Sequence, residues 1–451
     1  YLDYLGDLTV NSGQGRTSLE GDVESIFSIR EVTRSFYQDF GEIFREDLQD
    51  AIHGLKNPDD NLNAYTRTVV NRVLFLLFIE EKKWLDGDID YVENKYEEVA
   101  EDPDMRVYDD FFEPLFFEAL SEEGTTESDT LGRIPFLNGG LFERKDIEDD
   151  VEIEEAFFDK LLSPEEGDNG EPVGFLRRYK ISLRESNPSE QELVVDPEFI
   201  GRIFEMFMQE DERAEIGAFY TPKELTNHIV KSSLKRYVIT NTPELDEETV
   251  IAIISDHEVP ESIPSETVQH LIEQLKSVQV VDPAVGSGAF IIAMMDELVE
   301  LLDELYDTIG EKKDFFELKR GLIGKCLYGV DVDAGGVELC KFRTWLHLVQ
   351  ELDIGHEEFL AANDRYALPN LGFNFMVGNS LVGDEDPTGI SQLLDSDDGY
   401  QSNIDANFSE KHLKDRMAAK RREFINAHGE DKSRIKEEFI ELQQALDDKI
   451  N

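Results

Sequence analysis

The chain has 451 residues, of which 100 are Asp or Glu and 44 are Lys or Arg, so its formal net charge at pH 7 is −56. The length predicts two or three domains, and the 40% hydrophobic content excludes a wholly disordered chain. Two cysteines exclude a disulfide scaffold and a Cys-rich zinc site. No apolar run approaches the ~18 residues of a membrane-spanning helix, and the N-terminus lacks a signal-peptide pattern. We therefore expect a soluble, cytoplasmic protein without a membrane partner.

The acidic residues are spread along the whole chain rather than gathered in one tail. Such a charge repels nucleic acid at ordinary ionic strength. At molar salt the Debye length falls to about 3 Å, so a salt-filled cytoplasm favours this composition. We therefore expect a halophilic protein of the haloarchaeal kind, and the net charge says little about its ligand.

Residues 1–190 are predicted to form a mostly α-helical domain. Apolar residues recur at helical spacing from Ile29 to Leu55, and Ala64–Leu85 is a second helical segment rich in Val, Leu and Phe. A further helical stretch begins at Phe111.

Residues 191–385 differ in character, because short β-type runs alternate with helical segments. The expected elements are helices at Pro197–Met208 and Pro222–Tyr237, an acidic insert at Glu244–Ser265, a strand at Val278–Val281 with a helix at Ala289–Leu302, and a strand at Cys326–Val330 with a helix at Val337–Leu348. This strand–turn–helix order predicts an α/β fold with a doubly wound parallel sheet.

Residues 386–451 are predicted to be a charged insertion. A polar loop is followed by the helical stretch Glu410–Ile450, whose sparse apolar residues suit an exposed hairpin. Its basic residues could contact DNA phosphates, but pairing with neighbouring acids along a solvated helix is favoured. The basic residues are Lys411, Lys414, Arg416, Lys420, Arg421 and Arg422, and the acids are Glu410, Asp415 and Glu423.

The strongest local motif is the glycine-rich turn that follows the first strand of residues 191–385. Asp282 and Pro283 end the strand, and Gly286 and Gly288 precede the helix. Glycines allow a ligand to approach the backbone and the amides at the helix N-terminus. The third glycine of a dinucleotide fingerprint is replaced by Ile291, and the acid before the turn suits a ligand with an ammonium group. We favour ligand binding over a simple turn.

Three weaker motifs accompany this turn. Asp331 ends the second strand and could accept hydrogen bonds from ribose hydroxyls, with Asp333 as the alternative. Tyr220 and Thr221 precede a helix whose first turn contains Pro222, so that they could pack on a ligand. Asn379 could read a base edge, although a plain turn explains the same residues.

Together these motifs resemble the gamma-class N6-adenine DNA methyltransferases. The resemblance is closest to the methylase subunits of type IIG restriction–modification enzymes and related phage-defence methylases. Two earlier segments resemble the helical region that precedes the methylase in those proteins. The motifs are GAFYTP (217–222), DPAVGSGAF (282–290), GVDVD (329–333) and GNSL (378–381), and the earlier segments are Asn71–Leu85 and Ile134–Glu143.

The resemblance implies a Rossmann-like fold and S-adenosylmethionine as methyl donor. Tyr220, Thr221 and Pro222 would line the methionine side of the cofactor. Asp282, Ala284, Gly286 and Gly288 would hold its methionine end. Asp331 would bind the ribose, and Asn379 would meet the adenine. The cofactor residues implied are thus Tyr220, Thr221, Pro222, Asp282, Ala284, Gly286, Gly288, Asp331 and Asn379.

The chain departs from this family in one important respect. The catalytic Asn-Pro-Pro-Tyr/Phe loop, which holds the flipped adenine, does not occur in it. We therefore expect a fragment that ends before this loop, contains no catalytic residues and is inactive alone. The triplet Glu93–Lys95 resembles part of a nuclease motif but lies in a helix-like stretch, so no nuclease is assigned. The eight histidines have no metal-ligand spacing, and His228 and His347 are expected to be structural.

The sequence thus predicts the cofactor half of a DNA adenine-N6 methyltransferase from a restriction–modification or phage-defence system. Its partners would be double-stranded DNA, bound through the full-length protein, and other subunits of a restriction or defence complex. Two alternatives remain open at this point. One is a methyltransferase acting on RNA, protein or a small molecule, and the other is a non-catalytic DNA clamp or scaffold.

Overall fold

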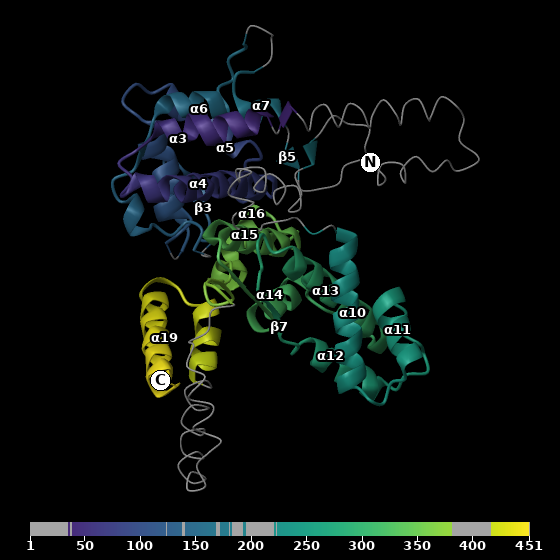
Figure 1. Ribbon diagram of the computed structural model, residues 1–451. Helices are drawn as coiled ribbons and strands as arrows, with labels where there is room; N and C mark the ends of the chain where they lie inside the picture. Colours follow the sequence, from purple (N-terminus) through teal and green to yellow (C-terminus); the bar gives the residue numbers. More distant parts are fainter. Residues whose placement is uncertain are drawn as a thin grey trace, which may run out of the picture.

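The computed structural model describes residues 35–36, 38–122, 124–137, 140–167, 172–179, 181–182, 193–194, 221, 223–380 and 416–450. Figure 1 shows the N-terminal helical region, purple to blue, above a second region, teal to green, that contains a parallel sheet. Helix α15 lies between them, beneath α4. Tyr220, Pro222 and the helix expected at 197–208 are outside the described residues.

The described part of the N-terminal region is mostly helical, with three two-stranded sheets. Its elements are η1 (Glu42–Asp47), α3 (Leu48–Ala51), β1 (Ile52–His53), α4 (Pro58–Glu81), α5 (Tyr91–Ala100), η2 (Val107–Phe112), η3 (Leu115–Ala119), β2 (Thr126–Ser128), β3 (Gly132–Ile134), η4 (Asp146–Glu148), β4 (Glu152–Ile153), α6 (Glu155–Leu162), α7 (Phe175–Arg178), β5 (Ile181–Ser182) and β6 (Leu193–Val194). Strands β1 and β4, and β2 and β3, pair antiparallel, whereas β5 and β6 pair parallel.

Helix α4 forms the centre of this region because its second half is apolar on every side. Phe75, Phe78 and Ile79 are fully buried, as expected for a helix surrounded by other elements. One charge is buried among them. Arg72 Nη2 lies 3.1 Å from Glu148 Oε2, and its Nε donates to the carbonyl of Leu141 at 2.9 Å. Each buried charge thus faces its partner within the core, although Nη1 of Arg72 has no hydrogen-bond partner among the described residues.

The second region contains a three-stranded parallel sheet with the order β7-β8-β9. Its elements are α10 (Lys223–Asn241), α11 (Glu247–Asp256), α12 (Ser265–Leu275), β7 (Val280–Asp282), α13 (Ala289–Ile309), α14 (Phe315–Cys326), β8 (Leu327–Asp331), α15 (Ala334–Gln350), α16 (His356–Ala361), η5 (Asn363–Tyr366) and β9 (Phe375–Val377). The two strands predicted from the sequence thus exist as β7 and β8, and β9 extends the sheet.

The two faces of the sheet differ in their burial. Leu327 and Phe375 are fully buried on one face. On the other face Val281 pairs with Tyr328, and Val281 is 63% exposed. Among the described residues, one face of this sheet is therefore less covered than the other, whereas parallel sheets are ordinarily covered on both faces.

Two sequence predictions for this part of the chain need correction. The stretch 244–265 was expected to be an acidic insert, but it contains the helix α11. Val250, Ile253 and Ile254 are buried at helical spacing, and Asp246 caps the helix by accepting from Thr249 N at 2.8 Å. The acids at the start of this insert are therefore helix N-terminal residues.

The C-terminal hairpin also differs from the expectation of an exposed arm. Residues 416–425 are helical and are followed by α19 (Gly429–Ile450). Phe373 stacks on Phe439 with ring centroids 4.2 Å apart, and Phe424 packs beside them. Lys420 Nζ lies 2.7 Å from both Glu423 and Glu438 carboxylates. The sparse apolar residues thus attach the hairpin to the loop before β9, and this basic residue is ion-paired.

The two regions share one hydrophobic core. Trp84, which follows α4, stacks on Phe359 of α16 with centroids 4.2 Å apart, and its Nε1 donates to the carbonyl of Ile354 at 3.0 Å. Lys82 donates to the carbonyl of Leu352 at 2.9 Å. The helical region is therefore packed directly against the helices of the sheet.

Two further observations bear on function. Glu93 and Lys95 lie in α5, where they pair with Arg177 and Glu98 respectively, as ordinary helix-surface residues do. Within the described part of the chain, no helix combines the length and the apolar composition that a membrane crossing requires.

Candidate functional site

The glycine-rich turn and the end of β8 meet at the carboxyl edge of the parallel sheet. The amide of Val285 donates to the carbonyl of Val330 at 3.0 Å, and the amide of Gly286 donates to Asp331 Oδ2 at 2.8 Å. The structure therefore brings together Asp282, Gly286 and Asp331, which the sequence singled out separately. Open α/β sheets bind ligands at this edge.

The structure gives a different reason for glycine at each of the two positions in the turn. Gly286 has φ +48° and Gly288 has φ +84°, a region that side chains rarely adopt. A Cβ on Gly288 would also lie 2.6 Å from the Sγ of Cys340 on α15. The second glycine therefore allows α13 to begin against α15, while nothing lies within 4 Å of a Cβ on Gly286.

Asp282 presents one satisfied and one unsatisfied oxygen. Its Oδ1 accepts from the amide of Ala284 at 3.0 Å, whereas among the described residues its buried Oδ2 has no hydrogen-bond partner. Burial raises the pKa of Asp282, and the charge of Asp331 adds to this effect. An unpaired buried carboxylate oxygen is unfavourable unless a donor is supplied, so the site fits a ligand with an ammonium or N–H group.

The structure separates the roles of the two acids that follow β8. Asp331 Oδ1 accepts from the amide of Asp333 at 2.9 Å, and its Oδ2 accepts from Gly286. Each carboxylate oxygen has a second lone pair, so Asp331 retains acceptors for ligand hydroxyls. Asp333 instead caps α15, accepting from the amides of Gly335 and Gly336 at 3.0 Å. Asp331 is thus the better candidate for ligand contact.

The remaining predicted residues are placed less fully. Thr221 is half-buried, and its carbonyl accepts from the Thr226 hydroxyl at 3.5 Å. Asn379 is exposed just beyond β9. Its neighbour Ser380 donates through Oγ to the carbonyl of Pro283 at 2.5 Å. The segment after β9 therefore lies against the Asp282–Pro283 turn.

Sequence reasoning missed two residues that shape the turn from behind. Arg343 of α15 is buried and donates to the carbonyl of Ser287 at 2.8 Å. A Cβ on Gly336 would lie 3.2 Å from the carbonyl carbon and oxygen of Gly286, so a larger residue would push on the turn. Arg343 gave no signal in the sequence, but the pair Gly335–Gly336 in the first turn of a helix, two residues after the capping Asp333, is an unusual sequence at a helix start.

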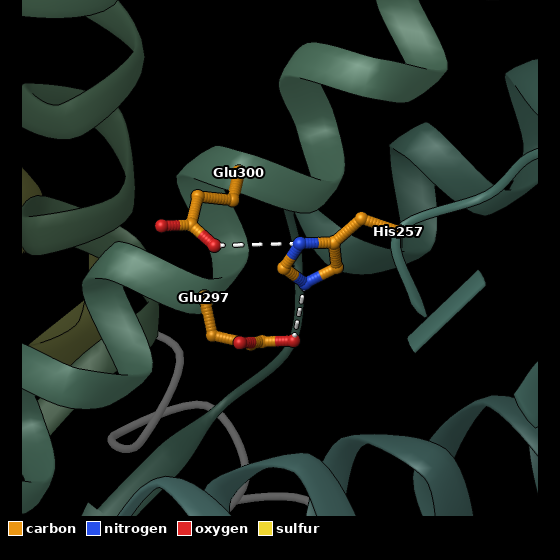
Figure 2. Close-up of side chains that lie close together, drawn as sticks. All are labelled: His257, Glu297 and Glu300. Carbon is orange, nitrogen blue, oxygen red and sulfur yellow. Dashed lines mark hydrogen bonds and ion pairs between the residues drawn. The ribbon is translucent and has the colours of Figure 1, made fainter. Parts of the chain in front are cut away.

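A second cluster, shown in Figure 2, lies on the far part of α13. His257, which ends α11, faces Glu297 through Nε2 at 3.0 Å and Glu300 through Nδ1 at 3.4 Å. Lys231 of α10 lies 3.4 Å from the same Nε2 and 3.6 Å from Glu297 Oε2. Because the carboxylates face opposite ring nitrogens and an ammonium group is already present, the geometry favours an ion-pair network over a metal site. The spacing of these residues in the sequence gave no sign of the cluster, since they come from α10, from α13 and from the residue that follows α11.

Of the two histidines expected to be structural, one is largely buried behind the site. The Nδ1 of His347 lies 3.5 Å from Asp296 Oδ1, between α15 and α13. Burial lowers the pKa of His347 to about 3 and raises that of Asp296 to about 6. His228, in contrast, is exposed on α10.

Comparison with known proteins places the chain beside restriction enzymes that are also methyltransferases. It is 31% identical over 333 residues to a putative type II restriction enzyme and methyltransferase of Methanocaldococcus jannaschii. It is 28% identical over 342 residues to the Escherichia coli type II restriction enzyme and methyltransferase RM.Eco57I. These alignments cover 70% and 72% of this chain but 27% and 28% of the relatives, so the chain spans about a quarter of their length.

The sequence was also compared with protein-family models, and the structure with solved structures. No protein-family model matches the sequence. Among solved structures, the type IIL restriction–modification enzyme MmeI in complex with DNA aligns with a TM-score of 0.46 and 17% identity, over 71% of this chain and 37% of that one.

Proposed function

We propose that this chain is the cofactor-binding part of a site-specific DNA adenine-N6 methyltransferase that uses S-adenosylmethionine and belongs to a restriction–modification or phage-defence system. The observation on which the proposal depends most is the hydrogen bond from Gly286 to Asp331, which joins the glycine turn to the acid of the next parallel strand. Similarity to two restriction enzyme–methyltransferases supports the methyltransferase class.

The residues present fit the cofactor. The unpartnered Oδ2 of Asp282 would accept from the ammonium group of the methionine end, and Gly286 and Gly288 would leave room for it along the backbone. Asp331 would accept from the ribose hydroxyls, and Asn379 would meet the adenine. When bound, S-adenosylmethionine supplies a methyl group activated by its sulfonium charge. Tyr220, Thr221 and Pro222 would complete the methionine side.

The fold proposed for this part is Rossmann-like. Three parallel strands in the order β7-β8-β9, each reached through helices, are consistent with one half of a doubly wound sheet. We propose residues 191–385 as the cofactor-binding part, residues 1–190 as a helical domain before it, and residues 386–451 as a helical insertion. The Asn-Pro-Pro-Tyr/Phe loop of those methyltransferases does not occur in this chain.

We further propose that the protein works in molar salt. At a net charge of −56 its surface would repel the phosphates of DNA at low ionic strength, whereas salt screens this repulsion and the self-repulsion of the fold. The midpoint of thermal unfolding is then expected to rise steadily between about 0.1 M and 2 M KCl, where the Debye length shortens from about 10 Å to below 3 Å. A midpoint that is constant or falls over this range would contradict halophilic adaptation.

Calorimetric titration with S-adenosylmethionine in molar KCl tests the cofactor proposal. Micromolar binding is expected for the wild type. Asp331→Ala removes the carboxylate that would accept two charge-assisted hydrogen bonds from the ribose hydroxyls. The affinity for S-adenosylmethionine should therefore weaken at least about tenfold. Asp129→Ala, which removes an exposed carboxylate in the turn between β2 and β3, serves as the matched control and should bind normally. Equal affinities for wild type and Asp331→Ala would contradict the assigned site.

The adenine specificity is tested on the full-length protein. DNA is incubated with tritium-labelled S-adenosylmethionine and digested to nucleosides. Label in N6-methyladenine is expected. Label in a methylated cytosine, or in RNA or protein when these are offered together with DNA, would favour another acceptor. A folded protein that binds DNA but no S-adenosylmethionine would favour the clamp or scaffold alternative.

A further inference from the structure

An arginine of the helical region reaches the edge of the parallel sheet where the proposed cofactor site lies. Arg67 is on α4, and its Nη1 lies 3.8 Å from Asp333 Oδ1. A Cβ built on Gly335 would lie only 2.1 Å from the same Nη1. The guanidinium therefore occupies the space above Gly335, at the first turn of α15. The side chains of Arg67 and Asp333 are 20% and 14% exposed.

Asp333 connects this arginine to the proposed ribose-binding acid. Its carboxylate accepts from the amides of Gly335 and Gly336 at 3.0 Å, and its own amide donates to Asp331 Oδ1 at 2.9 Å. The other oxygen of Asp331 holds the Gly286 amide of the turn. A continuous set of polar contacts thus runs from Arg67 through Asp333 and Asp331 to Gly286 in the turn.

The charges at this edge also require a cation. Asp282, Asp331 and Asp333 bring three carboxylates to the same end of the sheet. Among the described residues, the ion pair with Arg67 is the one recorded for any of these three acids. Without it, none of the three carboxylates would have a recorded ion-pair partner among the described residues, and like charges in a half-buried site repel.

We infer that Arg67 is a positioning residue of the cofactor site, supplied by the helical region, and that it couples occupancy of the site to that region. The inference rests on the proposed function. Arg67 holds Asp333 and the first turn of α15, and thereby orients the Asp331 carboxylate. Because coupling is reciprocal, ligand bound at Asp331 must in turn stabilise the segment of α4 around Arg67.

Three variants perturb this contact in different ways. Arg67→Gln removes the charge, and Arg67→Lys retains it on a group that lacks the planar fork. Gly335→Ala changes no charge but displaces the guanidinium, because the added methyl group takes its space. The matched controls are Arg236→Gln, on the exposed side of α10, and Gly321→Ala in α14, where a Cβ meets nothing within 4 Å.

Affinity for S-adenosylmethionine is measured by calorimetry in molar KCl on each variant. Arg67→Gln and Gly335→Ala should both weaken binding about threefold to tenfold, the effect of losing a partly buried ion pair. Arg67→Lys should lie between Arg67→Gln and the wild type, and both controls should bind within about twofold of it. Wild-type affinity in folded Arg67→Gln and Gly335→Ala would overturn the inference.

Hydrogen–deuterium exchange supplies a readout that a merely structural arginine would not change. Adding S-adenosylmethionine to the wild type should slow exchange of the α4 amides around Arg67, and this protection should be absent from Arg67→Gln at ligand saturation. Protection in both proteins, or in neither, would overturn the coupling. If the wild type bound no ligand, the proposed function itself would fail, whereas normal wild-type binding with unaffected variants would refute the role of Arg67 alone.

Discussion

Replacing Gly288 by alanine should destabilise the protein more than the same change at Gly286, two residues earlier in the turn. Both glycines have positive φ, +84° and +48°, so each alanine adopts an unfavourable backbone conformation. This contribution is about 1–2 kcal/mol at either position. Only at Gly288 does the new Cβ also meet a neighbour, the Sγ of Cys340 at 2.6 Å.

That contact adds an overpacking term of about 1–3 kcal/mol, because Cys340 is fully buried and α15 must shift to relieve it. Gly288→Ala is therefore expected to lower the free energy of unfolding by about 2–5 kcal/mol, and Gly286→Ala by about 1–2 kcal/mol. Urea denaturation in molar KCl, followed by circular dichroism, measures both values.

A double-mutant cycle isolates the proposed cause. Cys340→Ala removes the atom nearest to the new methyl group, although the Cβ and Cα of residue 340 remain 3.2 and 3.3 Å away. Gly288→Ala should therefore cost about 1 kcal/mol less in the Cys340→Ala background than in the wild type. Equal costs for Gly286→Ala and Gly288→Ala, or no coupling with residue 340, would refute the packing argument.

Three other variants test the charges and the core. Asp282→Asn should not lower the free energy of unfolding at pH 7 and could raise it, because burial raises the pKa of Asp282 and so disfavours its ionised form. Calorimetry should nevertheless show weaker binding of S-adenosylmethionine to this variant. Burial raises the pKa of Asp296 to about 6 from 3.8, so the folded protein holds this proton more tightly than the unfolded chain. Urea titrations should therefore show the wild type losing stability relative to Asp296→Asn as the pH rises from 3.8 to about 6, and parallel pH profiles would count against this. Trp84→Ala removes the contact with Phe359 and should cost about 3–5 kcal/mol while melting both regions in one transition; two separate calorimetric transitions in the wild type would show that the regions unfold independently.

The sequence was sufficient to predict the elements around the candidate site that depend on local chemistry. An apolar run that ends in Asp-Pro, glycines and a helix predicted β7, the turn and α13, and a second such run predicted β8 and Asp331. Parallel pairing then placed Gly286 against Asp331, since the carboxyl ends of neighbouring parallel strands lie together.

Contacts between distant segments could not be predicted in this way. Arg67 and Asp333 are far apart in the chain, and nothing in the pattern of α4 indicates that Arg67 lies over Gly335. The packing of the C-terminal hairpin through Phe439 was missed for the same reason. Its few apolar residues are enough to attach the hairpin, because they pack together against Phe373. Helix α11 was not predicted, because the acids of this insert mask the helical spacing of Val250, Ile253 and Ile254.

The location of the cofactor site is the central claim, and photochemical cross-linking tests it most directly. The protein is irradiated in molar KCl with S-adenosylmethionine labelled in its methyl group, and the labelled peptides are identified by mass spectrometry. We predict label in peptides that contain residues 282–290 or 327–333, reduced in proportion to affinity by Asp331→Ala. Saturable label confined to other peptides, and insensitive to Asp331→Ala, would contradict the account.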